Sequence, residues 1–312
     1  MRKQIFIFFI IFSIIVQAKL YGQSVPMYSQ YMYNMTNINP AYSGNRGVPS
    51  LAFIWRNQWV GLPGAPSSKS ITFDMPSENK KMGYGIQLFD DKYVSVIKRS
   101  GINLFYNIKV QVSEHGVLSL GLKGGFYNDS KLLTNVNLGP IVAYDYAFSS
   151  NVNKFVPLIG AGLYYNDDHF YAGFSAPDAV NFSTTKTYKS DSILYQLNEV
   201  HYFFTTGYSF DINEDLSIKP SILVKLSSGA PVQFDLNTNF WLKNKVGIGV
   251  SYRTGESFLG MAEVQVSPQF RIGYAYDVPF NPLKYFTRGS NELMLRFEFG
   301  NYKTKIKSTR YF

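Results

Sequence analysis

The sequence offers few residues for acid–base catalysis, since histidine occurs only three times, at His115, His169 and His201. A serine hydrolase needs a serine hydroxyl within hydrogen-bond reach of an imidazole, and a polar group that orients the ring. A barrel with lipolytic activity would have to use His201 together with Ser209 or Ser221. Because no Gly-x-Ser-x-Gly motif is present, we predict no catalytic residue and a protein that is not an enzyme.

Acidic residues occur as adjacent pairs, Asp-Asp at 90–91 and 167–168 and Glu-Asp at 214–215. Aspartate is common in turns, and none of these pairs has the ligand spacing of a calcium-binding loop. The chain has no cysteine, which excludes thiolate metal sites and disulfide bonds. The sequence therefore predicts no metal, no cofactor and no small-molecule substrate.

The secondary structure of the chain is clearest between Asp215 and Val278. Apolar and polar residues alternate there through five segments. In 246–253, for example, the even-numbered residues are apolar or aromatic, and the odd-numbered ones are glycine, serine or arginine. Successive side chains of a strand point to opposite faces, so each segment has one apolar and one polar face. Strands of this kind form either a soluble sandwich or a membrane barrel.

Strand length and buried charge both favour the barrel. The segments are about nine to twelve residues long, as in tilted strands that cross a bilayer, whereas soluble strands cluster near five or six. The polar positions of this alternation also include charged residues in the middle of the strands. The dry core of a sandwich would exclude such residues, whereas a water-filled lumen would accept them. These residues are Lys219, Asp235, Arg271, Arg296 and Glu298.

Residues 51–300 are expected to form an all-β, antiparallel, up-and-down transmembrane β-barrel of about fourteen strands. The expected strands are 51–60, 68–75, 81–89, 99–112, 117–127, 154–165, 169–175, 199–211, 216–225, 232–242, 246–253, 258–266, 270–276 and 291–300. Short turns alternate with longer connections, notably 130–153 and 176–198. This asymmetry predicts short periplasmic turns and long outer loops.

Both ends of the chain differ from the barrel region. Residues 1–22 resemble a secretory signal peptide, because Arg2 and Lys3 precede an apolar run over 5–16. Cleavage is expected after Ala18 or after Gly22. Residues 301–312 form a basic tail that we place in the periplasm. An exported barrel is expected in the outer membrane of a Gram-negative cell, in contact with lipid.

The overall charge of +9 does not indicate a nucleic-acid partner, because lysine and arginine are scattered and form no basic run. Aromatic residues make up 17% of the chain. This excess suits the aromatic girdles with which membrane barrels contact the two bilayer interfaces.

An N-terminal segment, residues 23–50, does not alternate. Methionine and tyrosine recur at spacings of three and four over 27–35, which predicts one or two helical turns that end before Asn39-Pro40. We expect 28–42 to fold into the lumen or against the periplasmic rim. The segment would act either as a plug without a partner or as a docking site.

Several motifs resemble those of the PorP/SprF family of type IX secretion system outer-membrane proteins of the Bacteroidetes. They include YSQYM at 28–32, NPAYSG at 39–44, RNQWVG at 56–61 and GSNELMLR at 289–296. The resemblance covers nearly all of the chain after the signal peptide and keeps the order of the motifs. It implies a non-enzymatic barrel that supports secretion or surface attachment of cargo, such as adhesins, by binding cargo or secretion machinery.

The alternative is a passive or hydrophobic-solute transporter, because about fourteen strands can enclose a lumen. Residues in the first three motifs are our candidates for a plug or partner-binding site. They are Tyr28, Gln30, Tyr31, Asn39, Pro40, Tyr42, Arg56 and Trp59.

Overall fold

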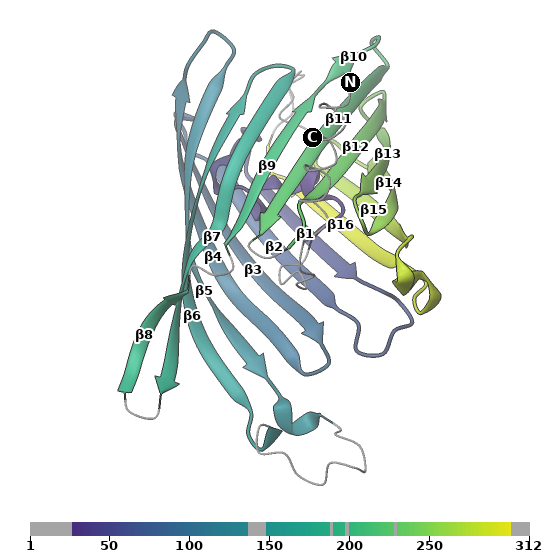
Figure 1. Cartoon of the computed structure of the whole chain (residues 1–312). Coiled ribbons are helices and arrows are strands. Elements are labelled where there is room, and N and C mark those ends of the chain that lie inside the picture. Colours follow the sequence, from purple (N-terminus) through teal and green to yellow (C-terminus); the bar gives the residue numbers. More distant parts are fainter. Residues whose placement is uncertain (1–26, 137–147, 188–189, 197–199, 228–229, 301–312) are drawn as a thin grey trace, which may run out of the picture.

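The computed structural model describes residues 27–136, 148–187, 190–196, 200–227 and 230–300, and over these residues fourteen antiparallel strands close into a barrel (Figure 1). The strands are β1 (Ser50–Asn57), β2 (Ser67–Pro76), β3 (Met82–Val94), β4 (Ile97–Gln111), β5 (Val117–Lys131), β6 (Val152–Asn166), β7 (Phe170–Thr187), β9 (His201–Tyr208), β11 (Leu216–Ser227), β12 (Gln233–Leu242), β13 (Val246–Arg253), β14 (Ser257–Gln265), β15 (Phe270–Pro279) and β16 (Ser290–Glu298). The ring closes where β1 pairs with β16. The predicted barrel class and strand number are confirmed.

Burial in the barrel is the reverse of burial in a soluble domain. On β13, Ile248 and Val250 are 60% and 57% exposed, whereas Ser251 and Arg253 on the other parity are buried. Soluble monomers rarely expose so large a contiguous apolar surface, whereas in a membrane barrel the acyl chains of the lipids cover it. The alternation that is visible in the sequence therefore points its apolar side outward and its polar side toward the lumen.

The two ends of the barrel are distinct. Ser50 at the start of β1 lies beside Glu298 at the end of β16 and Asp74 near the end of β2. Short turns such as 77–81 and 243–245 lie at this end, which we call the turn end. The longer connections lie at the opposite, loop end. In bacterial barrels the turn end faces the periplasm.

Some strands run further than the sequence predicts. The connection 176–198, expected to be a long loop, instead continues β7 to Thr187 and pairs it with β8 (Ser190–Gln196). This hairpin projects beyond the barrel at the lower left of Figure 1. Its threonines and Ile193 favour extended backbone, and β7 and β8 pair with each other in antiparallel register over 181–187 and 190–196. Of the loop expected at 130–153, residues 133–135 form a short helix, η4 (Leu133–Asn135).

Smaller elements complete the description. β10 (Phe210–Asp211) prolongs the β9 side of the sheet against β11, and η6 (Pro282–Tyr285) lies in the loop between β15 and β16. In the part of the chain that the structure describes, no helix is long and apolar enough to span a membrane.

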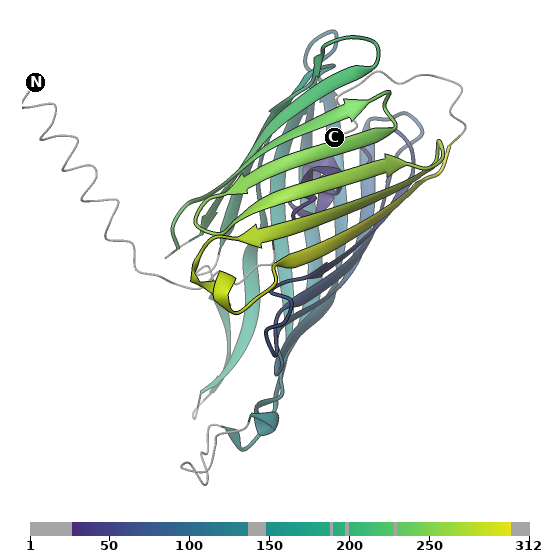
Figure 2. The ribbon, with the colours of Figure 1, turned by 90° about the vertical axis from the view of Figure 1, so that its right-hand side faces the viewer.

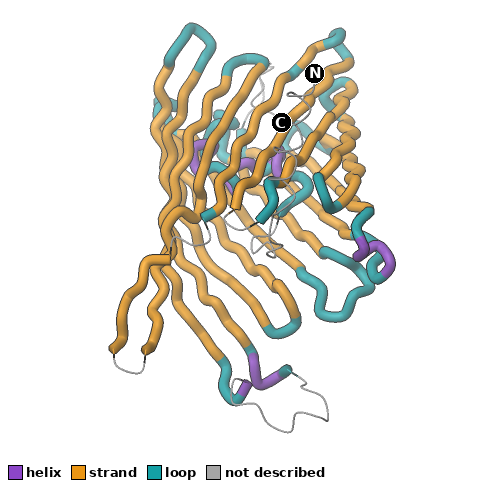
Figure 3. The backbone as a smooth tube through the Cα atoms, viewed as in Figure 1, coloured by secondary structure: helices purple, strands orange, loops and turns teal. Residues whose placement is uncertain are grey.

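Residues 27–49, which we call the lumen segment, contain three short 3₁₀ turns inside the ring of strands (Figure 3). These are η1 (Tyr31–Tyr33), η2 (Met35–Asn37) and η3 (Pro40–Tyr42). The two predicted turns, which end before Asn39-Pro40, are confirmed as η1 and η2, and a third turn that the sequence does not predict starts at Pro40. Asn39 is extended, as a residue before proline prefers, and its side chain accepts a hydrogen bond from Ala41 N that caps the new turn.

Candidate functional site

The lumen segment fills the centre of the barrel and is the most deeply buried part of the molecule. All residues from Ser29 to Arg46 are buried except Asn37, which is half-buried. Figure 2 shows the segment within the barrel, behind the strands that face the viewer. Its apolar side chains pack with inward-facing residues of the wall, among them Ile54, Leu223 and Met294. The lumen is therefore the hydrophobic core of this protein.

Arg56, on the inner face of β1, ties the beginning of the segment to the wall at the loop end. Its Nη2 donates to Asp277 Oδ2 at 2.6 Å, and its Nη1 donates to Ser29 Oγ at 2.6 Å and lies 3.3 Å from Glu292 Oε2. The Glu292 carboxylate also accepts backbone N–H groups of Ser29 and Gln30, both at 2.7 Å. One guanidinium and two carboxylates thus hold both backbone and side chain of the segment.

A second buried ion pair extends this anchor around the wall. Arg253 on β13 donates to both carboxylate oxygens of Asp235 on β12, with the shortest contact 2.7 Å from Nη2. Its Nη1 lies 3.9 Å from Asp277, so it connects to the Arg56 cluster. On β12, Asn237 donates to the hydroxyl of Tyr31 at 2.8 Å. We call the strands that carry this network, β1, β12, β13, β15 and β16, the anchor wall.

The middle of the segment, around residues 39–42, packs closely against strands β5 and β6. Asn39 Nδ2 donates to the carbonyl of Leu163 at 2.8 Å, and the ring of Tyr42 packs edge-on against Tyr164 at 5.2 Å. Gly121 on β5 lies directly beneath the backbone at Pro40 and Ala41, where any Cβ would overlap the segment. Glycine is therefore required at 121 for packing, because only a bare backbone leaves room for η3.

The end of the segment is fixed at the turn end. Gly44 N donates to Asp74 Oδ2 at 2.7 Å, and Lys109 Nζ donates to the carbonyl of Gly44 at 2.6 Å. Arg46 lies 3.3 Å from Glu298 and donates to the carbonyl of Tyr33 at 2.9 Å. The segment thus passes through the lumen from the loop end to the turn end.

The predicted site residues fall into two groups. Seven of the eight lie in or against the lumen segment: Tyr28, Gln30, Tyr31, Asn39, Pro40, Tyr42 and Arg56. Trp59 lies apart, half-buried in the outer loop between β1 and β2, with a left-handed φ of 48° and its N–H donated to Ser290 Oγ. A plug or partner-binding role for these residues stays a prediction.

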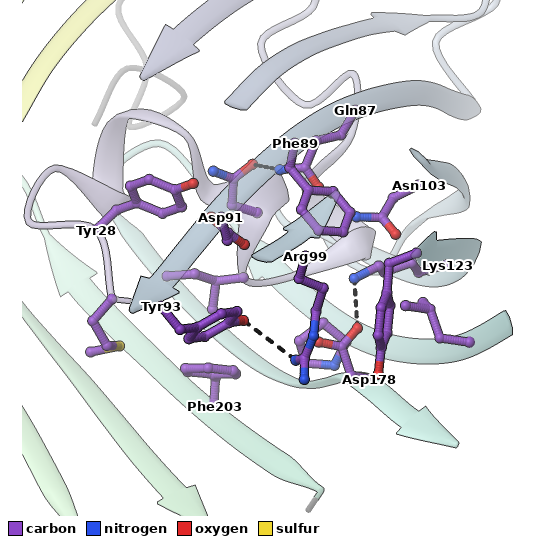
Figure 4. A pocket seen from close by; sticks show the side chains of 16 residues that line it. Tyr28, Gln87, Phe89, Asp91, Tyr93, Arg99, Asn103, Lys123, Asp178 and Phe203 are labelled. Carbon is purple, nitrogen blue, oxygen red and sulfur yellow. Dashed lines mark hydrogen bonds and ion pairs between the residues drawn. The ribbon is translucent and has the colours of Figure 1, made fainter. Parts of the chain in front are cut away.

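A cavity of about 110 Å³ remains beside the segment, against the opposite side of the lumen (Figure 4). Its wall comes from the loop-end parts of β3, β4, β5, β6 and β7, which we call the pocket wall, together with Phe203 on β9. Met27, Tyr28, Asn37 and Ile38 of the lumen segment complete it.

The charged groups of the cavity are mostly paired. Arg99 lies over the rings of Tyr93 and Tyr127, at 5.0 and 4.6 Å, and its Nε is 3.4 Å from Asp129. Lys123 Nζ donates to Asp178 Oδ1 at 2.7 Å. A chain of side-chain amides joins Asn103, Gln87 and Asn37, with donor–acceptor distances of 2.7 and 2.6 Å.

The acids that hold the lumen segment, Asp277 and Glu292, are not predictable as site residues from local pattern. Both residues lie on the polar, lumen-facing side of their strands and near the loop end, as Arg56 does. This common position along the strands is the one feature of the sequence that could have suggested that the three residues meet. The separation of Arg56 from Asp277 is 221 residues in the chain, so their contact depends on closure of the barrel.

The residues considered for hydrolytic chemistry are not brought together. His201 lies opposite Ser227 in the β9–β11 pairing, while Ser221 is opposite Gly207. Six residues of strand separate the two positions, which corresponds to about 20 Å. Among the described residues, no group of His, Asp and Glu side chains is arranged to hold a metal ion.

The fold resembles that of solved outer-membrane barrels at low sequence identity. The KdgM porin shares 8% identity, with a TM-score of 0.38 over 80% of this chain and 99% of the porin. The P. putida toluene transporter TodX shares 10%, with a TM-score of 0.45 over 86% and 95%. A Pseudomonas aeruginosa FadL homologue shares 12%, with a TM-score of 0.45 over 89% and 96%.

Comparison with protein families gives the more specific result. None of the curated proteins compared with the chain matches it. The profile of the type IX secretion system membrane protein PorP/SprF matches residues 20–297, nearly the whole chain. The protein is accordingly an outer-membrane β-barrel, and the chain belongs to the PorP/SprF family of type IX secretion system membrane proteins.

Proposed function

We propose that this chain is a non-enzymatic outer-membrane component of the type IX secretion system, which supports secretion or surface attachment of cargo by binding cargo or machinery. The observation that carries this proposal is the filled lumen. The segment 27–49 occupies the centre of the barrel and is held at both of its ends by buried ion pairs. A barrel whose lumen is a packed core is suited to hold other proteins at its rims.

The non-enzymatic part of the proposal has its own support. His201 is separated from Ser221 by about 20 Å along the sheet. Among the buried acids of the anchor wall, Glu292 and Asp277 contact Ser29 or Gln30 of the lumen segment and so hold it, and Asp235 pairs with Arg253 of the neighbouring strand.

Single-channel conductance in planar bilayers tests whether the lumen is closed. We expect the full-length barrel to show little conductance, and a variant that lacks residues 27–45 to show large open-channel events. A variant that lacks 301–312 is the matched control, because that deletion leaves the lumen segment intact. An open, salt-dependent conductance of the full-length barrel would support the transporter alternative instead.

A pull-down from solubilised outer membrane tests the binding part. Type IX secretion components or cargo with a type IX C-terminal signal should co-purify with the tagged full-length protein and be identified by mass spectrometry. An unrelated tagged barrel from the same membrane serves as the control. Equal recovery of these proteins with both barrels would contradict the proposal.

A further inference from the structure

The cavity beside the lumen segment contains one buried carboxylate with an oxygen that no described residue contacts by a hydrogen bond. Asp91, on β3, is 8% exposed and lines the cavity. Ser68, its neighbour on β2, hydrogen-bonds the carboxyl group, but within the described part of the chain Oδ1 of Asp91 has no hydrogen-bond partner. A buried charge of this kind is costly unless a partner compensates it.

The two cations of the cavity do not supply that partner. Arg99 is the cross-strand neighbour of Asp91, yet its guanidinium lies between the rings of Tyr93 and Tyr127 and pairs with Asp129. Lys123 pairs with Asp178. Each of these two cations forms an ion pair with a different acid, and among the described residues neither forms one with Asp91.

The aromatic lining decides which cation would fit. In Figure 4 the rings of Tyr28 and Tyr93 are drawn next to Asp91 and the ring of Phe203 below Tyr93, and all three line the cavity. Aromatic faces attract organic cations, and an apolar wall accepts the methylene groups next to an ammonium. Calcium or magnesium would instead require about six oxygen ligands, and the described residues include no group of acidic or histidine side chains arranged to hold a metal ion.

We propose that this cavity binds an alkylammonium group, with Asp91 as its counter-ion and the three rings as its walls. The lysine side chain of a polypeptide and a free small amine share this chemistry. The cavity lies at the loop end, so the ligand would approach from the outer face. The proposal goes beyond the secretion role and does not depend on it.

Isothermal titration of the purified full-length barrel in detergent tests the proposal. The probes are n-butylammonium, its neutral analogue n-butanol, and the peptides Gly-Gly-Lys-Gly-Gly and Gly-Gly-norleucine-Gly-Gly. We expect the ammonium probes to bind at least tenfold more tightly than their neutral analogues. Tighter binding of the lysine peptide than of butylammonium would indicate a polypeptide ligand, and the reverse order would indicate a free amine.

Two variants locate the site. Asp91→Asn keeps the shape of the side chain and should weaken the binding of butylammonium at least tenfold. Asp90→Asn is the matched control, since Asp90 is exposed on the opposite face of the same strand, and binding should change less than twofold. Equal binding of butylammonium and butanol by the unmodified barrel, or unchanged binding by Asp91→Asn, would overturn the proposal.

Discussion

The anchor wall and the pocket wall both bury charged residues at the loop end of the lumen, but they compensate them differently. On the anchor wall, Asp277, Glu292 and Asp235 each contact an arginine, and Glu292 also receives two backbone N–H groups of the lumen segment. On the pocket wall, Asp91 faces a cavity and keeps an oxygen without a partner among the described residues.

This difference shows how one interior can combine a structural role with a binding role. Where the buried acids at the loop end each contact an arginine, as on the anchor wall, removing one partner is strongly destabilising. Where a buried carboxylate oxygen lacks a partner beside a cavity, as at Asp91, the fold gives up some stability and retains capacity for a ligand. The following substitutions test whether the two walls are as different as the geometry indicates.

Arg56→Ala should have the largest effect, because it leaves Asp277 and Glu292 buried together without the guanidinium that joins them. We expect a loss of about 3–5 kcal/mol in unfolding free energy. The start of the lumen segment should also become accessible, which limited proteolysis and an increase in single-channel conductance would detect. A barrel that keeps both its stability and its low conductance after this substitution would remove the basis for the anchor wall.

Gly121→Val should follow, because a side chain at this position would overlap the backbone at Pro40 and Ala41. Overpacking of this kind costs about 1–3 kcal/mol, measurable as a lower thermal unfolding midpoint in detergent. Gly124→Val is the matched control on the same strand, since nothing lies within 4 Å of a Cβ there. Similar midpoints for the two variants would show that η3 does not rest on the wall.

Arg99→Ala should have a smaller effect than Arg56→Ala, although both remove an arginine from the loop end. The Arg99 side chain is 23% exposed and its acid lies at 3.4 Å, so the loss consists mainly of its contacts with Tyr93 and Tyr127. We expect about 1–2 kcal/mol from chemical unfolding. If Arg99→Ala destabilised the barrel as much as Arg56→Ala, the distinction between the two walls would fail.

The sequence predicts the parts of this fold that depend on local pattern. The alternation around Ile248 and Val250 predicts that this segment is a strand and that these two side chains lie on its lipid-facing side, because the period of a strand is two residues. The spacing of tyrosine and methionine over 27–35 predicts helical turns. It could not show that a further turn begins at Pro40, since η3 is shaped by its contact with Gly121 on β5.

The charged contacts of the site depend on closure of the ring and lie beyond local pattern. Arg56 is a candidate from its motif, but Asp277 and Glu292 become its partners only because β1, β15 and β16 are neighbours in the barrel. The Asp-Asp pair at 90–91 is predicted from the sequence to lie in a turn. In the structure it lies within β3, so Asp90 and Asp91 face opposite sides of the sheet. Signal-peptide cleavage and the basic tail lie outside the described residues and stay predictions.

Substitution of Asp167 should have the smallest effect on stability. This residue lies in the turn between β6 and β7 at the turn end, far from the cavity of the pocket wall. Its Oδ1 accepts the N–H groups of His169 and Phe170 at 2.8 and 2.7 Å. Burial acts to raise the pKa of Asp167, but these hydrogen bonds outweigh it and hold the pKa below the ordinary value of 3.8. A depressed pKa stabilises the fold above the unfolded-state pKa, and that stabilisation is lost as pH falls through the folded-state pKa.

Asp167→Ala should therefore lower the thermal unfolding midpoint slightly at neutral pH, and the difference from the unmodified barrel should shrink as the pH falls to about 2.5. Conductance and butylammonium binding should not change, because the turn contacts neither the anchor wall nor the cavity. A change in either readout would mean that the turn end and the loop end are coupled through the lumen segment. The two walls would then have to be treated as one cooperative unit.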